Sequence, residues 1–341
     1  MSRKLITLSL TSALLGGVAF ADVPQVAVDI APVHSLVARV MDGVGTPDLI
    51  VQTGASPHEY SLRPSEARAL QDAGLVFLIG PGLTPWLTDA LDTLAADASV
   101  TELLEADGTI ELEFRESALF EADGHADDEH GEEKHEDEKH GEEDHAADNH
   151  DDHDDHDDHD EEIAGHEGHN HGSHDPHAWL SPQNAMTWLN VIAAKLSAAD
   201  PDNAGTYFAN AAAGRADLET LIAEVSATLD PVRGGKFIVF HDAYQYFETD
   251  FDFSSTGAIS LSDAADPSPA RIAEIQESIA VDGVDCVLSE PQFNASLVET
   301  VLDGTQASTG IADPLGSDLE PGPELYPQLI RNLATTLKSC L

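Results

Sequence analysis

The sequence is poor in positive charge. Lysine and arginine together number 15 among 341 residues, against 64 aspartates and glutamates, and the formal net charge is −49 at pH 7. Nucleic acids and anionic membrane surfaces are bound through basic faces, so this composition disfavours both classes of partner. A cationic partner is favoured instead, and a metal ion is the smallest such partner.

Long hydrophobic runs are absent beyond the first 20 residues. A basic start at residues 3–4 precedes an apolar stretch at 5–20, and residues 19–21 (Ala-Phe-Ala) match the small-x-small cleavage pattern of secretory signals. The stretch is short for a membrane span, which needs roughly 20 apolar residues. We expect a cleaved signal peptide at residues 1–21 and a soluble, exported mature chain, with the periplasm as its compartment.

Cysteine is scarce as well, because Cys286 and Cys340 are the only two in the chain. An oxidising compartment favours a disulfide between them. The loop it closes would span 54 residues, which is worth about 4 kcal/mol in the chain-entropy model. A two-cysteine metal site is the alternative, but no histidine or further cysteine lies close to either residue in the sequence.

Acidic residues and histidines are concentrated in one segment. Residues 121–162 hold 23 acidic residues and two lysines, and 13 of the 17 histidines lie between His125 and His174. Apolar residues are nearly absent, so the segment cannot bury enough surface to offset the entropy lost on folding. We expect residues 121–174 to be a disordered insertion in the first lobe that binds metal weakly. The histidines predicted to form this weak metal-binding loop are His150, His153, His156, His159, His166, His169, His171 and His174.

The rest of the chain alternates between short apolar runs and amphipathic stretches, a pattern typical of parallel α/β folds. Strands are predicted at residues 26–30, 48–51, 75–79, 237–240, 286–288 and 310–312. Helices are predicted at residues 34–41, 64–73, 86–95, 269–280, 295–302 and 326–340, with another ending near residue 199.

A long helix is predicted at residues 201–229, where apolar positions recur with a period of 3.6. Such a helix would be about 40 Å long, enough to bridge two lobes. The expected organisation is a signal peptide (1–21), an N-terminal α/β lobe (22–200), a linking helix (201–230) and a C-terminal α/β lobe (231–341).

Three histidines outside the insertion share one context. His58 follows a proline in the loop after a predicted strand, His177 follows a proline where the ordered pattern resumes, and His241 ends a predicted strand. Asp313 also ends a short strand. Ligands of open α/β sheets collect at the carboxyl ends of strands, so these four side chains can converge on a cleft.

The donor types in this set favour zinc. Neutral imidazoles with one carboxylate form a tetrahedral zinc site, whereas magnesium, calcium and manganese prefer mostly oxygen donors. We predict His58, His177, His241 and Asp313 as the ligands.

Three further residues are candidates for supporting these ligands. Glu290 ends a strand, Glu59 directly follows a predicted ligand, and His34 lies near the start of the first helix, where it could equally be a core residue.

The sequence resembles the zinc-uptake periplasmic solute-binding proteins of ABC transporters, the cluster A-I family. The resemblance covers nearly all of the mature chain. The matching stretches are residues 54–65 (GASPHEYSLRPS), 177–182 (HAWLSP), 240–244 (FHDAY), 289–293 (SEPQF) and 313–316 (DPLG).

The resemblance implies two α/β lobes joined by one long rigid helix, with the metal held between them. It implies that each lobe contributes two ligands. Zinc-type relatives often carry a charged insertion before the second ligand, and residues 121–174 resemble it. The resemblance also implies the disulfide between Cys286 and Cys340. Manganese-type relatives carry glutamate at the place of His241, so histidine there favours zinc. Some relatives have an acidic residue where this chain has Pro57, one that can complete the site. The fourth ligand therefore stays open between Asp313 and water.

The function that the resemblance implies is high-affinity capture of Zn²⁺ in the interlobe cleft and delivery to the membrane permease of a zinc ABC importer. We expect a monomer with no enzymatic activity, and periplasmic zinc chaperones are further candidate partners. A secreted zinc hydrolase is disfavoured because the chain has no His-Glu-x-x-His pair and no Gly-x-Ser-x-Gly motif.

The alternative function is a periplasmic zinc buffer or chaperone that works mainly through the insertion. Three roles for residues 121–174 stay open within the transport hypothesis: passing zinc to the cleft, sensing zinc, or neither.

Overall fold

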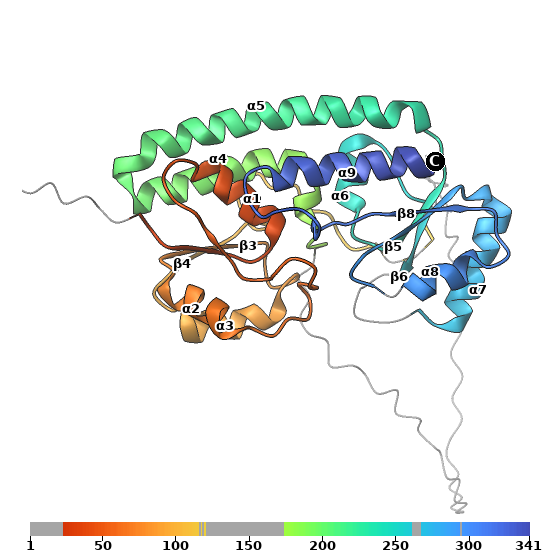
Figure 1. Cartoon of the computed structure of the whole chain (residues 1–341), viewed down its shortest axis with the longest axis horizontal. Coiled ribbons are helices and arrows are strands. Elements are labelled where there is room, and N and C mark those ends of the chain that lie inside the picture. The colour runs from red at the N-terminus through yellow and green to blue at the C-terminus, as the bar shows by residue number, and fades with distance from the viewer. Residues whose placement is uncertain (1–22, 116, 118, 121–173, 261–266, 294) are drawn as a thin grey trace, which may run out of the picture.

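The computed structural model covers most of the chain outside its N-terminus and the acidic insertion (Figure 1). The residues that it describes are 23–115, 117, 119–120, 174–260, 267–293 and 295–341. The expected signal peptide and the expected insertion, up to residue 173, lie outside them. No helix in the described part of the chain is long and apolar enough to cross a membrane.

Two parallel four-stranded sheets form the frame of the molecule. In the first, the order β2-β1-β3-β4 is made by Asp48–Leu49, Val26–Val28, Leu75–Leu78 and Ser99–Glu102. In the second, the order β6-β5-β7-β8 is made by Gly257–Ser260, Phe237–His241, Cys286–Ser289 and Ser308–Ile311. The prediction of two α/β lobes with parallel sheets is confirmed.

Helices cover both faces of each sheet, as the continuous apolar strands require. In β3, Leu75 and Phe77 face the large core, whereas Val76 and Leu78 pack with residues of α2 and α3. The helices of the first half are α1 (Ala31–Val40), α2 (Pro64–Asp72), α3 (Pro85–Leu94) and α4 (Pro182–Ala199). Those that follow are α5 (Ala204–Leu229), α6 (Gln245–Phe251), α7 (Pro269–Ser278), α8 (Ala295–Leu302) and α9 (Leu325–Cys340).

Helix α5 lies above both sheets and runs along most of the long axis of the molecule, and α9 lies beneath it (Figure 1). Both helices pack on α1, so the C-terminal helix forms a second connection between the lobes. The backbone N–H of Tyr326 in α9 donates to Ser35 Oγ in α1 at 2.9 Å. One hydrophobic core continues from the first sheet through these helices to the second sheet, so the lobes do not have separate interiors.

Three elements were not predicted: β4, α6 and β6. Strand β4 buries only Thr101 among its four residues, so it has no apolar run. Strand β6 is a short edge strand that begins with a glycine. Helix α6 has seven residues, less than two full turns, which is too short to show a helical repeat of apolar positions. Elements this short are specified by their neighbours rather than by their own sequence pattern.

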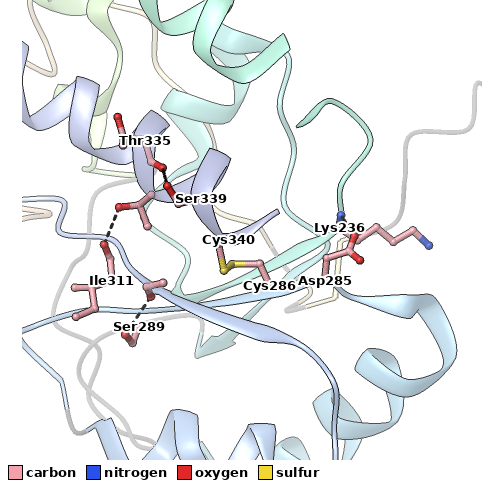
Figure 2. The surroundings of a disulfide bond; sticks show 10 residues. Lys236, Asp285, Cys286, Ser289, Ile311, Thr335, Ser339 and Cys340 are labelled. Carbon is pink, nitrogen blue, oxygen red and sulfur yellow. Dashed lines mark hydrogen bonds between the residues drawn. A yellow bond between two sulfur atoms is a disulfide. The ribbon is translucent and has the colours of Figure 1, made fainter. Parts of the chain in front are cut away.

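Cys286 of β7 and Cys340 at the end of α9 form a disulfide, with their Cα atoms 5.6 Å apart (Figure 2). The pairing favoured from the sequence is confirmed. Thr336 Oγ1 also donates to the carbonyl oxygen of Ile311 at 3.1 Å, which adds a second attachment of α9 to the sheet. The disulfide thus fixes the C-terminal helix, and with it part of the shared core, to the second lobe.

Reducing this disulfide should lower the free energy of unfolding by about 2–4 kcal/mol, because the unfolded chain regains the freedom of a long loop. Urea unfolding of the oxidised and reduced protein measures the difference. A Cys286→Ala/Cys340→Ala variant is the control and should be insensitive to reductant. Equal midpoints for the oxidised and reduced wild type would contradict the prediction.

Candidate metal centre

A pocket of about 20 Å³ lies between the lobes, near the carboxyl ends of their strands. That volume holds roughly one water-sized atom, so the pocket suits an ion. Its lining residues are Ser56, Pro57, His58, His177, Trp179, His241, Glu290, Gln292, Phe293, Pro314 and Leu315. The three histidines predicted as ligands are therefore brought together.

His177 is held by a carboxylate two residues before it. Asp175 Oδ1 accepts a hydrogen bond from the His177 backbone N–H at 2.9 Å and lies 2.6 Å from its Nδ1. A single 3-10 turn, Ala178–Leu180, follows the histidine and is fully buried. Local chain geometry and one buried carboxylate together fix the direction of this ring.

His241 is held in the same way by a neighbouring strand. It is the last residue of β5, and its Nδ1 lies 2.7 Å from Oε1 of Glu290, which directly follows β7. Strands β5 and β7 are parallel neighbours, so their carboxyl ends bring these two side chains together. Glu290 thus lies beside a predicted ligand, and its supporting role stays a prediction.

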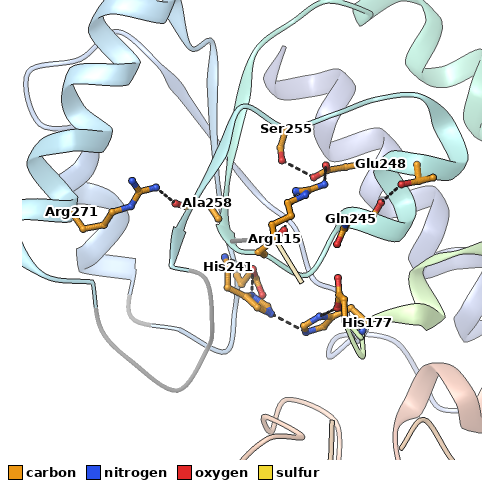
Figure 3. Close-up of polar contacts among 12 residues, drawn as sticks. Arg115, His177, His241, Gln245, Glu248, Ser255, Ala258 and Arg271 are labelled. Carbon is orange, nitrogen blue, oxygen red and sulfur yellow. Dashed lines mark hydrogen bonds and ion pairs between the residues drawn. The ribbon is translucent and has the colours of Figure 1, made fainter. Parts of the chain in front are cut away.

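The two rings face each other across the lobes through their other nitrogens. Nε2 of His177 lies 3.4 Å from Nε2 of His241 (Figure 3). Carboxylates accept hydrogen bonds, so in a neutral imidazole each Nδ1 carries the proton and each Nε2 presents a lone pair. Two nitrogens bound to one tetrahedral zinc at about 2.0–2.1 Å would be about 3.3–3.4 Å apart. These two atoms therefore already have the spacing of zinc ligands.

His58 approaches this pair from the loop after β2. Its ring centre lies 5.6 Å from that of His177. Trp86 Nε1 donates to the carbonyl oxygen of Pro57 at 2.7 Å and so anchors the loop to α3. Among the described residues, no three His, Cys, Asp or Glu side chains already converge on one point as metal donors. His58 would complete the set by turning toward the other two rings.

Asp313 lies close by but is occupied by its own turn. Oδ1 accepts from Gln292 Nε2 and from the backbone N–H groups of Leu315 and Gly316, and Oδ2 accepts from the N–H and hydroxyl of Ser317. Asp313 does not line the pocket. Joining a metal would require this turn to rearrange.

Two buried carboxyl groups near the pocket have raised pKa values. Burial raises the pKa of Asp175 to about 7, although the His177 amide and nearby positive charge lower it. Burial also raises the pKa of Asp242 to about 7, against the opposing effect of Arg115. A raised carboxyl pKa means that burial disfavours the ionised form, and a divalent cation nearby would favour that form and lower the pKa again.

Two of the three residues proposed as supports lie away from the pocket. His34 Nε2 is 3.0 Å from the carbonyl oxygen of Pro47, so this buried histidine anchors α1 to the chain before β2 and orients no predicted ligand. Glu59 is exposed to solvent. Of the predicted weak metal-binding loop, His174 alone is described; its Nδ1 lies 3.2 Å from Glu111 Oε2.

Sequence reasoning missed Asp175 and Arg115. Asp175 stands two residues before a predicted ligand, a spacing that lets a carboxylate reach the following backbone N–H, so the sequence did contain a signal. Arg115 bridges Asp242 and Glu248, at 3.0 Å and 2.5 Å, and no local pattern relates residues more than 120 positions apart.

The comparisons with known proteins agree with this fold. A family model described as "ZnuA: Zinc-uptake complex component A periplasmic" matches residues 26–340. The "High-affinity zinc uptake system protein ZnuA" of Brucella abortus (strain 2308) is 48% identical over 343 residues, covering 99% of each chain. The protein of the same name from Paracoccus denitrificans (strain Pd 1222) is 42% identical, covering 94% of this chain and 93% of its own.

Solved structures show the same fold. "Crystal structure of ZnuA" superposes with a TM-score of 0.69 at 22% identity, covering 94% of this chain and 99% of the other. A structure described as a "138-173 ZnuA deletion mutant plus zinc bound" gives a TM-score of 0.68 at 22% identity, covering 94% and 98%. On the family model and the 48% identity, this chain belongs to the ZnuA family of periplasmic zinc-uptake components.

Proposed function

We propose that this chain captures Zn²⁺ in the pocket between its lobes, in the periplasm, and delivers it to the membrane permease of an ABC-type importer. The observation that carries the proposal is the pair of opposed imidazoles, His177 and His241, each oriented by a buried carboxylate. Carboxylate–histidine pairs are the usual support of zinc ligands in proteins. The zinc-uptake names of the relatives support the same ion and the same importer.

The proposed ligands are His58, His177 and His241, with the fourth position taken by water or by Asp313. Water needs no change in the chain, whereas Asp313 would have to give up hydrogen bonds within its turn. We therefore assign water to the fourth position and keep Asp313 as the alternative ligand.

A transport role rather than an enzymatic one follows from the space available. An open coordination position on zinc also serves catalysis in hydrolases, but those enzymes need room for an organic substrate beside the metal. Here the pocket is about 20 Å³ and is lined in part by apolar groups such as Trp179, Phe293 and Leu315. The proposed cargo is the ion itself.

Zinc titration against a competing chelator tests the pocket as the tight site. A mature chain lacking residues 121–173 should retain one tight site, and His241→Ala in that background should weaken it by at least about a hundredfold, or 2.7 kcal/mol. His174→Ala is the matched control, because His174 contacts Glu111 outside the pocket and its loss should leave the tight site intact. If the shortened chain has no tight site, the pocket assignment fails and the insertion becomes the functional part.

An Asp313→Asn variant decides the fourth ligand. With water in that position, zinc affinity should stay within about twofold of wild type, a change of roughly 0.4 kcal/mol. Thermal stability should fall, because Asp313 Oδ2 now accepts a hydrogen bond from the Ser317 N–H, and an amide NH₂ in its place would put two donors face to face. Chelator competition and a melting curve on the same sample separate the two effects. A loss of affinity of about a hundredfold would assign the position to Asp313.

A further inference from the structure

A short segment, residues 109–115, crosses from the first lobe to the second beside the metal pocket. We call it the crossing segment. It is fixed to the first lobe by Asn184 of α4, whose Oδ1 accepts from the Ile110 N–H at 2.7 Å and whose Nδ2 donates to the Ile110 carbonyl oxygen at 3.0 Å. Its far end, Arg115, lies against the second lobe.

The middle of the crossing segment holds the residue that orients His177. The carbonyl oxygen of Leu112 accepts from the Asp175 N–H at 2.8 Å. Tyr246 Oη, from α6 of the second lobe, accepts from the Leu112 N–H at 3.0 Å and donates to the Asp175 carbonyl oxygen at 2.8 Å. Leu112, Asp175 and Tyr246 therefore form a closed hydrogen-bonded group that includes both lobes.

The end of the crossing segment holds the chain around His241. Arg115 Nη1 lies 3.0 Å from Oδ1 of Asp242, which directly follows His241, and Nη2 lies 2.5 Å from Oε2 of Glu248 in α6 (Figure 3). Asp242 and Glu248 expose only 5% and 2% of their side chains, so the guanidinium is their main source of charge compensation. The Arg115 guanidinium also stacks 4.0 Å from the ring centre of Phe120.

We propose that Arg115 is a positioning residue for zinc binding: through it the crossing segment sets the separation between His177 and His241. Leu112 binds Asp175, the residue that orients His177. Arg115, three residues later, binds Asp242, which directly follows His241. Each lobe contributes one of the two rings, so the Nε2–Nε2 distance of 3.4 Å depends on the contacts that hold the lobes together beside the pocket. The inference rests on the proposed zinc-binding function.

A purely structural role for Arg115 predicts something different. If the guanidinium only neutralised buried carboxylates, its loss would lower stability and leave the affinity of the folded protein for zinc unchanged. A lysine at this position would then suffice, because it supplies the same charge. A positioning role needs the planar fork that spans Asp242 and Glu248, and one ammonium group cannot reproduce that geometry.

Arg271 offers a matched control within the second lobe. Its side chain is 17% exposed, against 19% for Arg115; it pairs with Glu274 at 2.7 Å, and it donates to the Ala258 carbonyl oxygen at 2.8 Å (Figure 3). Arg271 does not line the pocket. Its replacement by glutamine removes an arginine of similar burial and its ion pair with the exposed Glu274, without touching the crossing segment.

Zinc affinity, measured by chelator competition on the full mature chain, tests the proposal. Tryptophan fluorescence is the readout, because Trp179 lines the pocket with its ring centre 5.3 Å from that of His177, and so reports on this site. Arg115→Gln should weaken zinc binding by about ten- to a hundredfold, the range for losing support of metal ligands. Arg115→Lys should recover much of the thermal stability yet still bind zinc about tenfold more weakly. Arg271→Gln should change affinity by less than about twofold, because it shares no contact with the ligands.

Two results would overturn the inference: wild-type affinity in folded Arg115→Gln, or wild-type affinity in Arg115→Lys. If Arg115→Gln does not fold, Arg115→Lys decides alone. Failure of the underlying function would look different, because the wild-type chain itself would then show no tight zinc-dependent change in fluorescence.

Discussion

The structure depends on one constraint: two imidazoles from different lobes must face each other through Nε2 at the spacing of zinc ligands. His177 and His241 meet it at 3.4 Å. Each ring has a buried carboxylate on its Nδ1, so its Nε2 points at the partner ring. On the proposed function, this spacing would let one ion bind both rings without moving them apart.

A spacing set between lobes is only as fixed as the lobes themselves. Here they share one hydrophobic core, are spanned by α5 and α9, and are crossed again by residues 109–115. The disulfide fastens α9 to the second sheet, and Arg115 fastens the crossing segment to α6. Connections at several points disfavour a wide hinge motion. Zinc binding is therefore expected to move local groups, above all the loop that carries His58, rather than whole lobes.

Much of this architecture follows from the sequence, because long periodic elements and strand ends are local signals. The apolar run at residues 75–79 predicted a strand, and it forms β3, with both faces buried. His241 and Glu290 were placed at strand ends that the parallel pairing makes neighbours. Other features depend on tertiary contact. The position of His34 against Pro47, and the bridge from Arg115 to Asp242, link groups that no local pattern relates. Short edge elements such as β4 escaped prediction because only one of its residues is buried.

The central claim concerns which atoms receive the metal. The carboxylates on Nδ1 of His177 and His241 leave Nε2 as the donor atom in both rings. A crystal structure of the mature chain with one equivalent of zinc, using anomalous scattering at the zinc edge, locates the ion directly. The account predicts one strong peak about 2.0–2.1 Å from both Nε2 atoms, with the Asp175 and Glu290 contacts retained. A peak bonded through Nδ1, or a zinc ion bound outside the pocket with the two rings left facing each other, would contradict it.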